Sequence, residues 1–403
     1  MDAPPLTTAD HQFAKRRRLS LAIVAGEASG DLLAGAVLRG LSDSLGDIDS
    51  IGVGGPALRA AGMNTWTDIS ALSVRGYAEV VAALPRLLWL RSSLRRRFQR
   101  LRPDLFLGVD APDFNLALER DLKAAGIRTV HFISPSIWAW RPERIDSIRV
   151  AVDHMLLVFP FEQDIFDRAG IAATYVGHPL ADMLEPISDS SRPRRELGLH
   201  FARPVVALLP GSRPDEIRYM AKTFLAAAAW LHARIPEVQF VLPAASEPLH
   251  AELARLVHAE GLHGKLDLHL ILGQSHRAMA AADTVLVASG TATLEAALLA
   301  KPMTISYQMS PISYRIMRRK GILPWIGLPN ILCKESLVPE FIQGAASAHN
   351  LGASLLAQLS DEALRTRLRQ RFSDLHGTLK RNCAARSAEV IATLVGERRG
   401  HPL

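Results

Sequence analysis

The sequence predicts an α/β protein made of two successive parallel-sheet domains. Short apolar or β-branched runs alternate with longer helical patterns, first through LSLAIVAG, DLFLGVD, RTVHFI and DHMLLVF. The rhythm then begins again at PVVALLPG and continues through VQFVLPAA, LDLHLILG and DTVLVASG. With 403 residues, 48% hydrophobic and 22% charged, the chain is too long for one ordinary core and apolar enough for two.

Polar and turn-forming residues at 185–200 interrupt both periodicities and predict the domain boundary. We therefore expect a basic flexible tail over 1–18, a first domain over 19–190 and a second over 191–359. Residues 360–403 alternate Leu and Ala with Arg and Glu at helical spacing, which predicts closing helices that pack on the N-terminal half or on a partner chain. The basic start resembles a signal peptide, but Glu27 and Asp31 cut its apolar run short, so a buried first strand explains it better.

The net charge of +7 favours an anionic partner: nucleic acid, a phosphate-bearing small molecule or a bilayer surface. The two cysteines have no metal-ligand spacing and fit a reducing compartment. No apolar stretch reaches the ~20 residues of a membrane span, so any membrane contact must be peripheral. Nucleic acid ranks last, because the arginines concentrate on an apolar helix without interleaved aromatic stacking positions.

The first turn of the first domain, AGEASGDLLAG at 25–35, is acidic. Glu27 and Asp31 argue against a phosphate cradle and for neutral hydroxyls, while Ser29 could simply cap the helix that we expect from about Asp31. The nearby GVGGPA at 52–57 matches a dinucleotide pattern only loosely, and we interpret it as a turn because Pro56 falls inside it.

Residues 79–102 combine an apolar side with a cationic one. Such a helix can lie in a membrane interface, where each basic residue adds ~1 kcal/mol of attraction to an anionic leaflet. The alternative is a core-packed helix with a basic solvent face. For the membrane reading we expect contacts from Leu84, Leu87, Leu88, Trp89, Arg91, Arg95 and Arg96.

The run LGVDAPDFN at 107–115 places Asp110 at the end of a predicted strand, where a carboxylate can take a proton from a hydroxyl nucleophile. Asp113 is expected to cap the following helix, and a purely structural turn around Pro112 is the alternative. Trp138 and Trp140 stand beside arginines and suit a sugar or a phosphate, but core packing is favoured for them. His178 before a proline is interpreted as a structural, hydrogen-bonded residue.

Two turns of the second domain suit anions. In ALLPGSRPDEI at 207–217, Gly211 lets the backbone approach, Ser212 can cap or donate, and Arg213 offers a fork for phosphate; a tight turn with a solvated arginine is the alternative. In VLVASGTATLE at 285–295, small residues and hydroxyls at a helix start make a second nest. One turn further in, Glu295 can accept from a ribose diol or merely favour the helix dipole, so the sequence indicates a nucleotide. The second nest comprises Ser289, Gly290 and Thr291.

The runs AGEASGD, GVGGP, GVDAPDFN, SPSIWAWR, GHPLAD, LLPGSR, ASGTATLE and LPNIL follow one another over nearly the whole chain after the basic tail. Together they resemble the lipid-A-disaccharide synthase family. The resemblance implies the GT-B fold, two Rossmann-like domains facing a cleft, and an inverting glycosyltransferase that works without metal or cofactor. It implies transfer of the diacylglucosamine unit of UDP-2,3-diacylglucosamine to the 6-hydroxyl of 2,3-diacylglucosamine 1-phosphate in lipopolysaccharide synthesis.

The resemblance also implies roles for the residues. Asp110 is the base; Glu27 and Ser29 hold the acceptor; Asn330 and Gln343 join the donor contacts already described. Members are peripheral on the inner face of the cytoplasmic membrane in Gram-negative bacteria, and several resemble homodimers that exchange C-terminal segments. The alternatives are another GT-B enzyme, such as a UDP-N-acetylglucosamine epimerase or a peptidoglycan-precursor transferase, and a non-catalytic, nucleotide-regulated membrane-surface protein.

Overall fold

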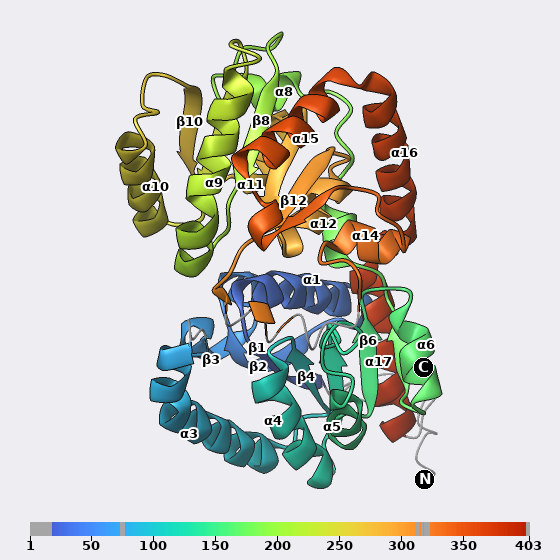
Figure 1. Cartoon of the computed structure of the whole chain (residues 1–403). Coiled ribbons are helices and arrows are strands. Elements are labelled where there is room, and N and C mark those ends of the chain that lie inside the picture. The colour runs from blue at the N-terminus through green and yellow to red at the C-terminus, as the bar shows by residue number, and fades with distance from the viewer. Residues whose placement is uncertain (1–17, 73–76, 312–313, 316, 318–322, 400–403) are drawn as a thin grey trace, which may run out of the picture.

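The N-terminal domain is built on a seven-stranded sheet. The computed structural model describes residues 18–72, 77–311, 314–315, 317 and 323–399. Every neighbouring strand pair of this sheet is parallel, in the order β3-β2-β1-β4-β5-β6-β7 (Figure 1). The strands are β1 Leu19–Ala25, β2 Ile48–Gly54, β3 Asn64–Asp68, β4 Leu105–Val109, β5 Arg128–Phe132, β6 His154–Leu157 and β7 Ala173–Tyr175.

Helices cover both faces of this sheet, because its strands are apolar on both sides. Ile23 and Val109 face a cluster that includes residues of α1, whereas Val24 and Phe106 face one with residues of α3 and α4. The helices of this domain are α1 Ala28–Leu45, α2 Pro56–Ala60, α3 Tyr77–Leu101, α4 Pro112–Ala124, α5 Arg144–Ala151 and α6 Glu162–Arg168, with a 3-10 turn at Ile69–Ala71.

The C-terminal domain repeats the arrangement with a six-stranded parallel sheet in the order β10-β9-β8-β11-β12-β13. Its strands are β8 Val205–Leu209, β9 Gln239–Ala244, β10 Asp267–Leu272, β11 Thr284–Ala288, β12 Met303–Tyr307 and β13 Glu340–Ile342. Its helices are α9 Pro214–His232, α10 Glu247–Ala259, α11 Ser275–Ala281, α12 Thr291–Leu298, α14 Leu328–Cys333 and α15 Ala348–Ser360, with a 3-10 turn at Gln343–Ala345.

Two segments of the chain connect the domains. The first carries the short helices α7 Pro179–Met183 and α8 Ser191–Glu196, and the second passes from α16 Glu362–Leu379 to α17 Cys383–Arg399. The connections are hydrogen-bonded to each other, since the Asp182 carboxylate accepts from the backbone N–H groups of Asn382 and Cys383 at 2.9 and 2.6 Å. As a result α17, the last helix of the chain, packs against α1, the first helix of the N-terminal domain (Figure 1).

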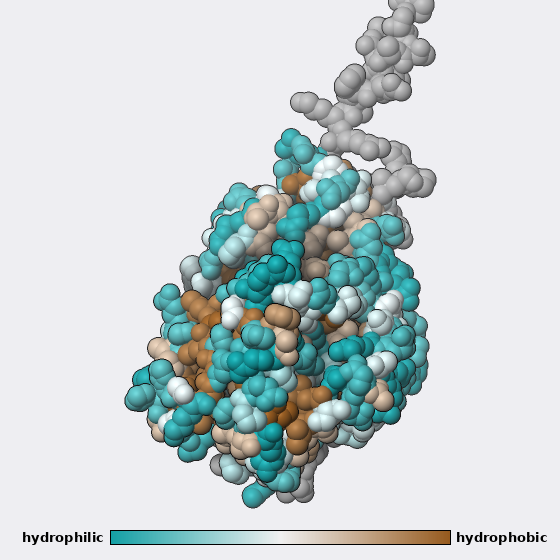
Figure 2. Space-filling view, turned by 90° about the horizontal axis from the view of Figure 1, so that it is seen from above, coloured by the Kyte–Doolittle hydropathy of each residue, from teal (hydrophilic) through white to brown (hydrophobic). Residues whose placement is uncertain are grey.

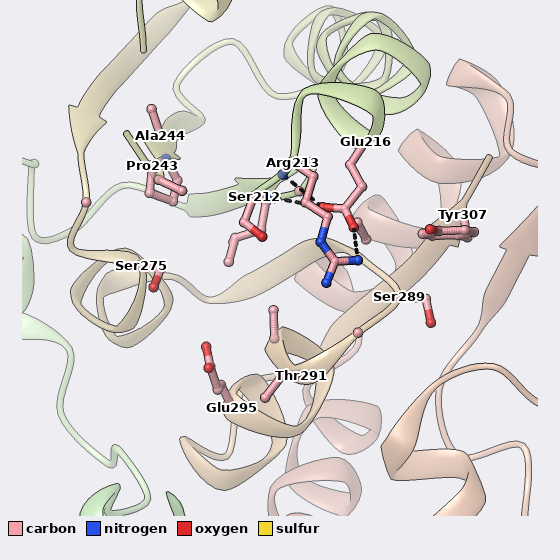
Figure 3. A pocket seen from close by; sticks show the side chains of 17 residues that line it. Ser212, Arg213, Glu216, Pro243, Ala244, Ser275, Ser289, Thr291, Glu295 and Tyr307 are labelled. Atoms are coloured by element: carbon pink, nitrogen blue, oxygen red, sulfur yellow. Dashed lines mark hydrogen bonds and ion pairs between the residues drawn. The ribbon is translucent and has the colours of Figure 1, made fainter. Parts of the chain in front are cut away.

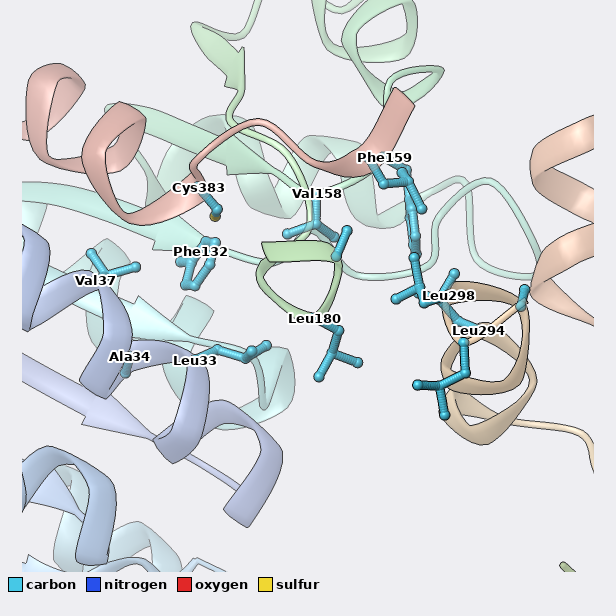
Figure 4. Close-up of a cluster of buried hydrophobic side chains, with 14 of the residues drawn as sticks. Leu33, Ala34, Val37, Phe132, Val158, Phe159, Leu180, Leu294, Leu298 and Cys383 are labelled. Carbon is cyan, nitrogen blue, oxygen red and sulfur yellow. The ribbon is translucent and has the colours of Figure 1, made fainter. Parts of the chain in front are cut away.

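The largest buried cluster runs through both domains. Figure 4 shows Leu33 and Val37 of α1 gathered with Leu180 of α7, Leu294 of α12 and Cys383 of α17. The N–H of Ile187 also donates to the carbonyl of Leu299 at 3.1 Å, tying the first connection to the C-terminal domain. The two domains therefore share apolar packing at the connections.

The structure confirms the predicted fold class and the buried first strand. Some local predictions differ. Helix α1 begins at Ala28 rather than near Asp31, and its N-cap is Glu27 rather than Ser29. The GVGGPA run is the end of β2, a turn and the start of α2, and α4 begins before Asp113, which stays exposed and pairs with Arg144.

Seen from above the C-terminal domain, the surface is mostly hydrophilic, and hydrophobic residues gather on it in separate patches (Figure 2). Among the helices of the described ranges, none is long and apolar enough to span a bilayer. The basic tail predicted over 1–18 lies outside the described residues up to position 17.

Candidate active site

A cavity of about 390 Å³ opens at the carboxyl ends of β8, β9, β11 and β12. Strand ends of parallel sheets converge at one edge, so the turns that follow β8 and β11 lie side by side, as these strands are neighbours. Figure 3 shows the side chains of Arg213, Ser275, Thr291 and Glu295 around this space. The lining includes seven residues predicted from the sequence: Gly211, Ser212, Arg213, Ser289, Gly290, Thr291 and Glu295.

The turn after β8 already holds an anion, which is the Glu216 carboxylate. Its Oε2 atom accepts hydrogen bonds from the backbone N–H groups of Ser212 at 2.8 Å and Arg213 at 3.2 Å (Figure 3). Its Oε1 atom lies 3.8 Å from an Arg213 guanidinium nitrogen. Gly211 is required here, because a Cβ atom at that position would lie 2.4 Å from the Glu216 Cβ, and because its φ is +134°. The cation of Arg213, whose side chain is 67% exposed, is what this turn offers to a ligand.

The turn after β11 has a different arrangement. Gly290 is the N-cap of α12 with a φ of +154°, and within the described part of the chain no side-chain cap is found at the start of that helix. The hydroxyls beside it are used within the protein: Ser289 Oγ donates to the carbonyl of Ile326 at 2.8 Å, and Thr293 Oγ1 to that of Gly290, also at 2.8 Å. Backbone N–H groups at a helix start favour an anionic ligand.

Glu295 points into the cavity and pairs with a histidine that the sequence reading did not single out. The Glu295 Oε2 atom lies 3.2 Å from Nε2 of His276 on α11. The hydrogen bond to Glu295 raises the pKa of the His276 imidazole above its ordinary value, against partial burial. A ligand hydroxyl that approaches Glu295 therefore meets a carboxylate with an internal partner.

Asn330 and Gln343 do not line the cavity. Asn330 is fully buried; its amide nitrogen donates to Val338 O at 2.9 Å and to Glu340 Oε1 at 2.8 Å, and its oxygen accepts from the Val338 N–H. Gln343 pairs with the backbone N–H and C=O of Met309. The Asn330 amide holds the chain around Glu340, which in turn binds the loop at 326–327, and a direct contact of Asn330 with the donor stays a prediction.

In the N-terminal domain, the first turn of α1 and the end of β4 lie together, because β1 and β4 are neighbours. A Cβ atom on Gly30 would lie 3.8 Å from the Asp110 Cβ, so Asp110 sits beside the turn that carries Glu27 and Ser29, both exposed. Asp31 does not share their surroundings: it is buried, and its carboxylate accepts from the N–H groups that start α2, at Gly55, Ala57 and Leu58.

The backbone at Asp110 is strained. Asp110 and Ala111 have φ values of +52° and +44°, a left-handed region that costs non-glycine residues about 1 kcal/mol or more each. Hydrogen bonds hold this conformation: the Asp110 N–H donates to Phe132 O at 3.0 Å, and Asn115 Nδ2 donates to Asp110 O at 2.8 Å. Strain of this kind collects at functional sites, where it fixes the direction of a side chain.

The predicted membrane helix α3 is exposed in part. Leu84, Leu88 and Trp89 are 44%, 51% and 67% exposed, and Leu87 is half-buried. Arg96 is exposed, Arg91 is half-buried, and Arg95 pairs with Asp121 at 3.3 Å. The following turns of the helix pack into the domain through Leu90, Leu94 and Phe98.

The remaining motif residues are mainly structural. Trp138 donates to the buried Glu162 at 3.1 Å, whereas Trp140 is 43% exposed with the Arg141 guanidinium 4.3 Å from its ring centroid. His178 is buried, accepts from the Leu180 N–H at 3.2 Å and starts α7, as expected for a structural histidine, and burial lowers its pKa to about 4. Over the described ranges, no group of three or more His, Cys, Asp or Glu side chains is placed to hold a metal ion.

Sequence reasoning missed part of the cavity. Glu216 could have been found, because a carboxylate three residues after a helix N-cap is the usual partner of free N–H groups. Ser275 comes shortly after β10 and Tyr307 is the last residue of β12, but nothing in their local sequence distinguishes them from ordinary helix-start and strand residues. The lining positions outside the predicted set are Leu209, Glu216, Pro243, Ala244, Ala245, Gly273, Ser275, Ala288, Ala292 and Tyr307.

The two parallel-sheet domains define a class, the two-domain α/β proteins with the GT-B fold. The fold is similar to that of a putative UDP-N-acetylglucosamine 2-epimerase from Listeria monocytogenes, with a TM-score of 0.64 and 14% identity over 96% of this chain and 98% of that one. It is also similar to the UDP-N-acetylglucosamine 2-epimerase from Neisseria meningitidis bound to UDP-N-acetylglucosamine, with a TM-score of 0.60 and 12% identity over 94% and 100% of the two chains.

The sequence comparisons identify the family. The family model described as Lipid-A-disaccharide synthetase matches residues 21–394. The chain is 49% identical to the lipid-A-disaccharide synthase of Paraburkholderia phymatum, over 95% of this chain and 98% of the relative, and 49% identical to that of Thiobacillus denitrificans, over 92% and 98%. The chain belongs to the lipid-A-disaccharide synthase family. The predictions of a glycosyltransferase and of a role in lipid A biosynthesis are thereby confirmed.

Proposed function

We propose that this chain moves the diacylglucosamine unit of UDP-2,3-diacylglucosamine to the 6-hydroxyl of 2,3-diacylglucosamine 1-phosphate, with inversion at the anomeric carbon. The acceptor oxygen forms the new bond to that carbon, and the bond to the diphosphate oxygen breaks and leaves UDP with the electron pair. The observation that carries the proposal is the cavity at the ends of β8 and β11. It is lined by the guanidinium of Arg213, by the start of α12 at Gly290, and by the carboxylate of Glu295 one turn further along α12.

The leaving group is stabilised by the C-terminal domain. Arg213 supplies a cation for the diphosphate, and the N–H groups at the start of α12, around Gly290 and Thr291, supply hydrogen-bond donors. Glu295 accepts from the ribose hydroxyls. Charge stabilisation of this kind by preorganised donors is usually the largest single contribution to catalysis.

The acceptor is held and activated by the N-terminal domain. Asp110 takes the proton of the 6-hydroxyl as the bond to the anomeric carbon forms, and the strained backbone at its position fixes the direction of its carboxylate. Glu27 and Ser29, exposed on the neighbouring turn, bind acceptor hydroxyls. Gln343 and Asn330 act on the donor side by holding the loops beside the cavity.

The test is to incubate the purified protein with both substrates in detergent and to follow UDP release and disaccharide phosphate by mass spectrometry. We expect both products, and we expect Arg213→Ala and Asp110→Asn to lose them. Two matched controls keep activity: Arg218→Ala, on the helix that follows Arg213 and similarly exposed, and Asp113→Asn, three residues beyond Asp110. UDP release without disaccharide would show a different acceptor, and UDP binding with neither product would favour the non-catalytic reading.

The proposal includes docking at the inner face of the cytoplasmic membrane through α3. Leu84, Leu88 and Trp89 expose apolar area beside Arg96, a combination suited to an anionic interface. The measurement is co-sedimentation with vesicles of zwitterionic lipid with and without phosphatidylglycerol. We expect Leu88→Ser/Trp89→Ser to weaken binding to both and Arg96→Gln only the dependence on anionic lipid. Unchanged binding in the double variant would contradict docking through this helix.

A homodimer that exchanges C-terminal segments is also part of the proposal. Helix α17 packs on α1, and the chain bends between α16 and α17 at Asn382, whose φ is +54°. If this bend opened, α17 of one copy could occupy the same surface on a second copy. Light scattering of the intact protein checks the mass, and a monomer at all concentrations would exclude the exchange.

A further inference from the structure

A buried acid–imidazole pair lies directly behind the end of the strand that carries Asp110. Glu119 Oε1 of α4 lies 2.7 Å from His131 Nδ1 of β5, and both side chains are fully buried. His131 is the register partner of Gly108 on β4, and Gly108 lies two residues before Asp110, which directly follows that strand. The pair has no role in the reaction as described so far.

The backbone makes room for this pair. A Cβ atom on Gly108 would lie 2.0 Å from Glu119 Oε1 and 3.2 Å from His131 Nδ1, so any larger residue would displace the pair. Asn115, one helical turn before Glu119 on α4, is also fully buried. Its Nδ2 donates to the carbonyl oxygens of Val24, Val109 and Asp110, which end two neighbouring strands.

Stability does not explain the cluster. Among the described residues, Asn115 Oδ1, Glu119 Oε2 and His131 Nε2 are buried without a hydrogen-bond partner. Unpaired buried polar atoms are unfavourable, and a buried ion pair is often no more stable than apolar residues of the same shape. These buried polar groups lie next to Asp110, whose backbone is strained, and this combination indicates a functional role.

Glu119 and His131 shift each other's protonation. Burial by itself lowers the pKa of the His131 imidazole, but Glu119 and, to a smaller extent, Asp110 raise it above its ordinary value. Burial raises the pKa of the Glu119 carboxyl. The pair therefore holds a proton between Oε1 and Nδ1. The charged groups that face His131 are Glu119 from α4 and Asp110 from the end of β4.

We propose that Asn115, Glu119 and His131 form a buried positioning cluster that fixes the end of β4 and, with it, the direction of the Asp110 carboxylate. Asn115 holds the strained carbonyl, β5 holds the Asp110 N–H through Phe132 O, and the Glu119–His131 pair fixes β5 against α4. The inference rests on the proposed role of Asp110 as the base. None of the three residues contacts substrate.

The experiment compares Glu119→Gln and His131→Asn with the unchanged protein, using both substrates. We expect kcat to fall about 10- to 100-fold, as is typical when a group that orients a reactive residue is lost, with KM for the UDP-sugar within about twofold. UDP binding stays unchanged, because its residues lie in the other domain.

The control is Asp153→Asn, which removes a carboxylate paired with Lys123 and the Thr129 N–H at the opposite end of the same sheet, and which keeps kcat. A folded Glu119→Gln or His131→Asn protein with kcat within twofold of the original overturns the cluster. If both single variants unfold, Glu119→Met/His131→Leu decides in the same way, because an apolar pair leaves no unpaired charge. Asp110→Asn is measured alongside: activity in that variant contradicts the base itself, a separate outcome.

Discussion

The two turns that line the cavity of the C-terminal domain look alike in sequence and differ in the structure. Both follow neighbouring strands, contain a glycine at positive φ and start a helix. In the turn after β8, the N–H groups of Ser212 and Arg213 are bound by Glu216, whereas no side chain among the residues that the structure describes caps the start of α12 at Gly290. One turn presents a cation, and the other presents backbone donors.

The position of one carboxylate explains the difference. Glu216 is the third residue of its helix, from which a side chain can reach back to the N-cap, as in a capping box. Glu295 is the fifth residue of α12 and points into the cavity instead, where it pairs with His276. A shift of two positions along a helix thus decides whether an acidic residue closes an anion site or borders it.

Arg213→Ala is the strongest test of this comparison. If the turn after β8 acts only through its side chain, kcat/KM falls about 100- to 1,000-fold, as for the loss of one donor to a developing charge. Arg213→Lys keeps the charge and recovers part of that loss, since an ammonium lacks the two-pronged geometry. Steady-state kinetics with the UDP-sugar measure both variants. A loss no larger than that of Arg218→Ala would show that the first turn does not serve the diphosphate.

Substitutions of Gly290 and Gly211 test the difference between the two turns separately for ligand affinity and for stability. Gly290→Ala places a Cβ atom in open space but strains a backbone with φ of +154°, so we expect UDP affinity to fall about tenfold with a small loss of stability. Gly211→Ala forces the new Cβ against Glu216, so its stability loss is larger. Calorimetric titration with UDP and thermal unfolding give the two quantities. If the two variants lose UDP affinity in the same proportion to their loss of melting temperature, the two turns do not differ in their role.

Glu216→Gln tests whether the internal carboxylate opposes the ligand. The amide keeps the shape and can still accept from the N–H groups, but it removes a negative charge beside the diphosphate. We expect UDP to bind about three- to tenfold more tightly at low salt, with the gain reduced by screening at high salt, while the weaker cap costs about 1 kcal/mol of stability. Weaker UDP binding would show that Glu216 orients Arg213 rather than occupying its site.

The sequence was sufficient for what depends on local pattern. Apolar runs and turn residues placed the strand ends, and with them Arg213, Gly290 and Asp110, at the correct edges of the two sheets. The sequence did not predict the hydrogen-bond partner of a polar side chain where that partner lies in a distant part of the chain. Asp31 looks like part of an acidic ligand turn, yet it binds the N–H groups that start α2, more than twenty residues away.

The buried residues show the same limit. Asn330 belongs to a shared motif, but its amide is used by Val338 and Glu340. Glu119 reads as an ordinary polar residue of a helix, and His131 as one residue of an apolar strand; only the packing of α4 on the sheet brings them together. Periodicity reports which face of an element is buried, whereas the partner of a buried polar group depends on tertiary contacts.

The smallest effect concerns pH and the carboxylate that stays open to the ligand. Glu295 raises the pKa of His276 above 6.5, so their ion pair is fully formed below that pH and is lost as the pH rises through the raised value. If the ribose hydroxyls compete with His276 for Glu295, UDP affinity rises about two- to threefold as the pH increases through this range, and His276→Gln removes the dependence. Titrations with UDP at several pH values measure it. If the pH dependence of UDP binding remains in His276→Gln, another group titrates, and the Glu295–His276 pair only links α12 to α11 without affecting the ligand.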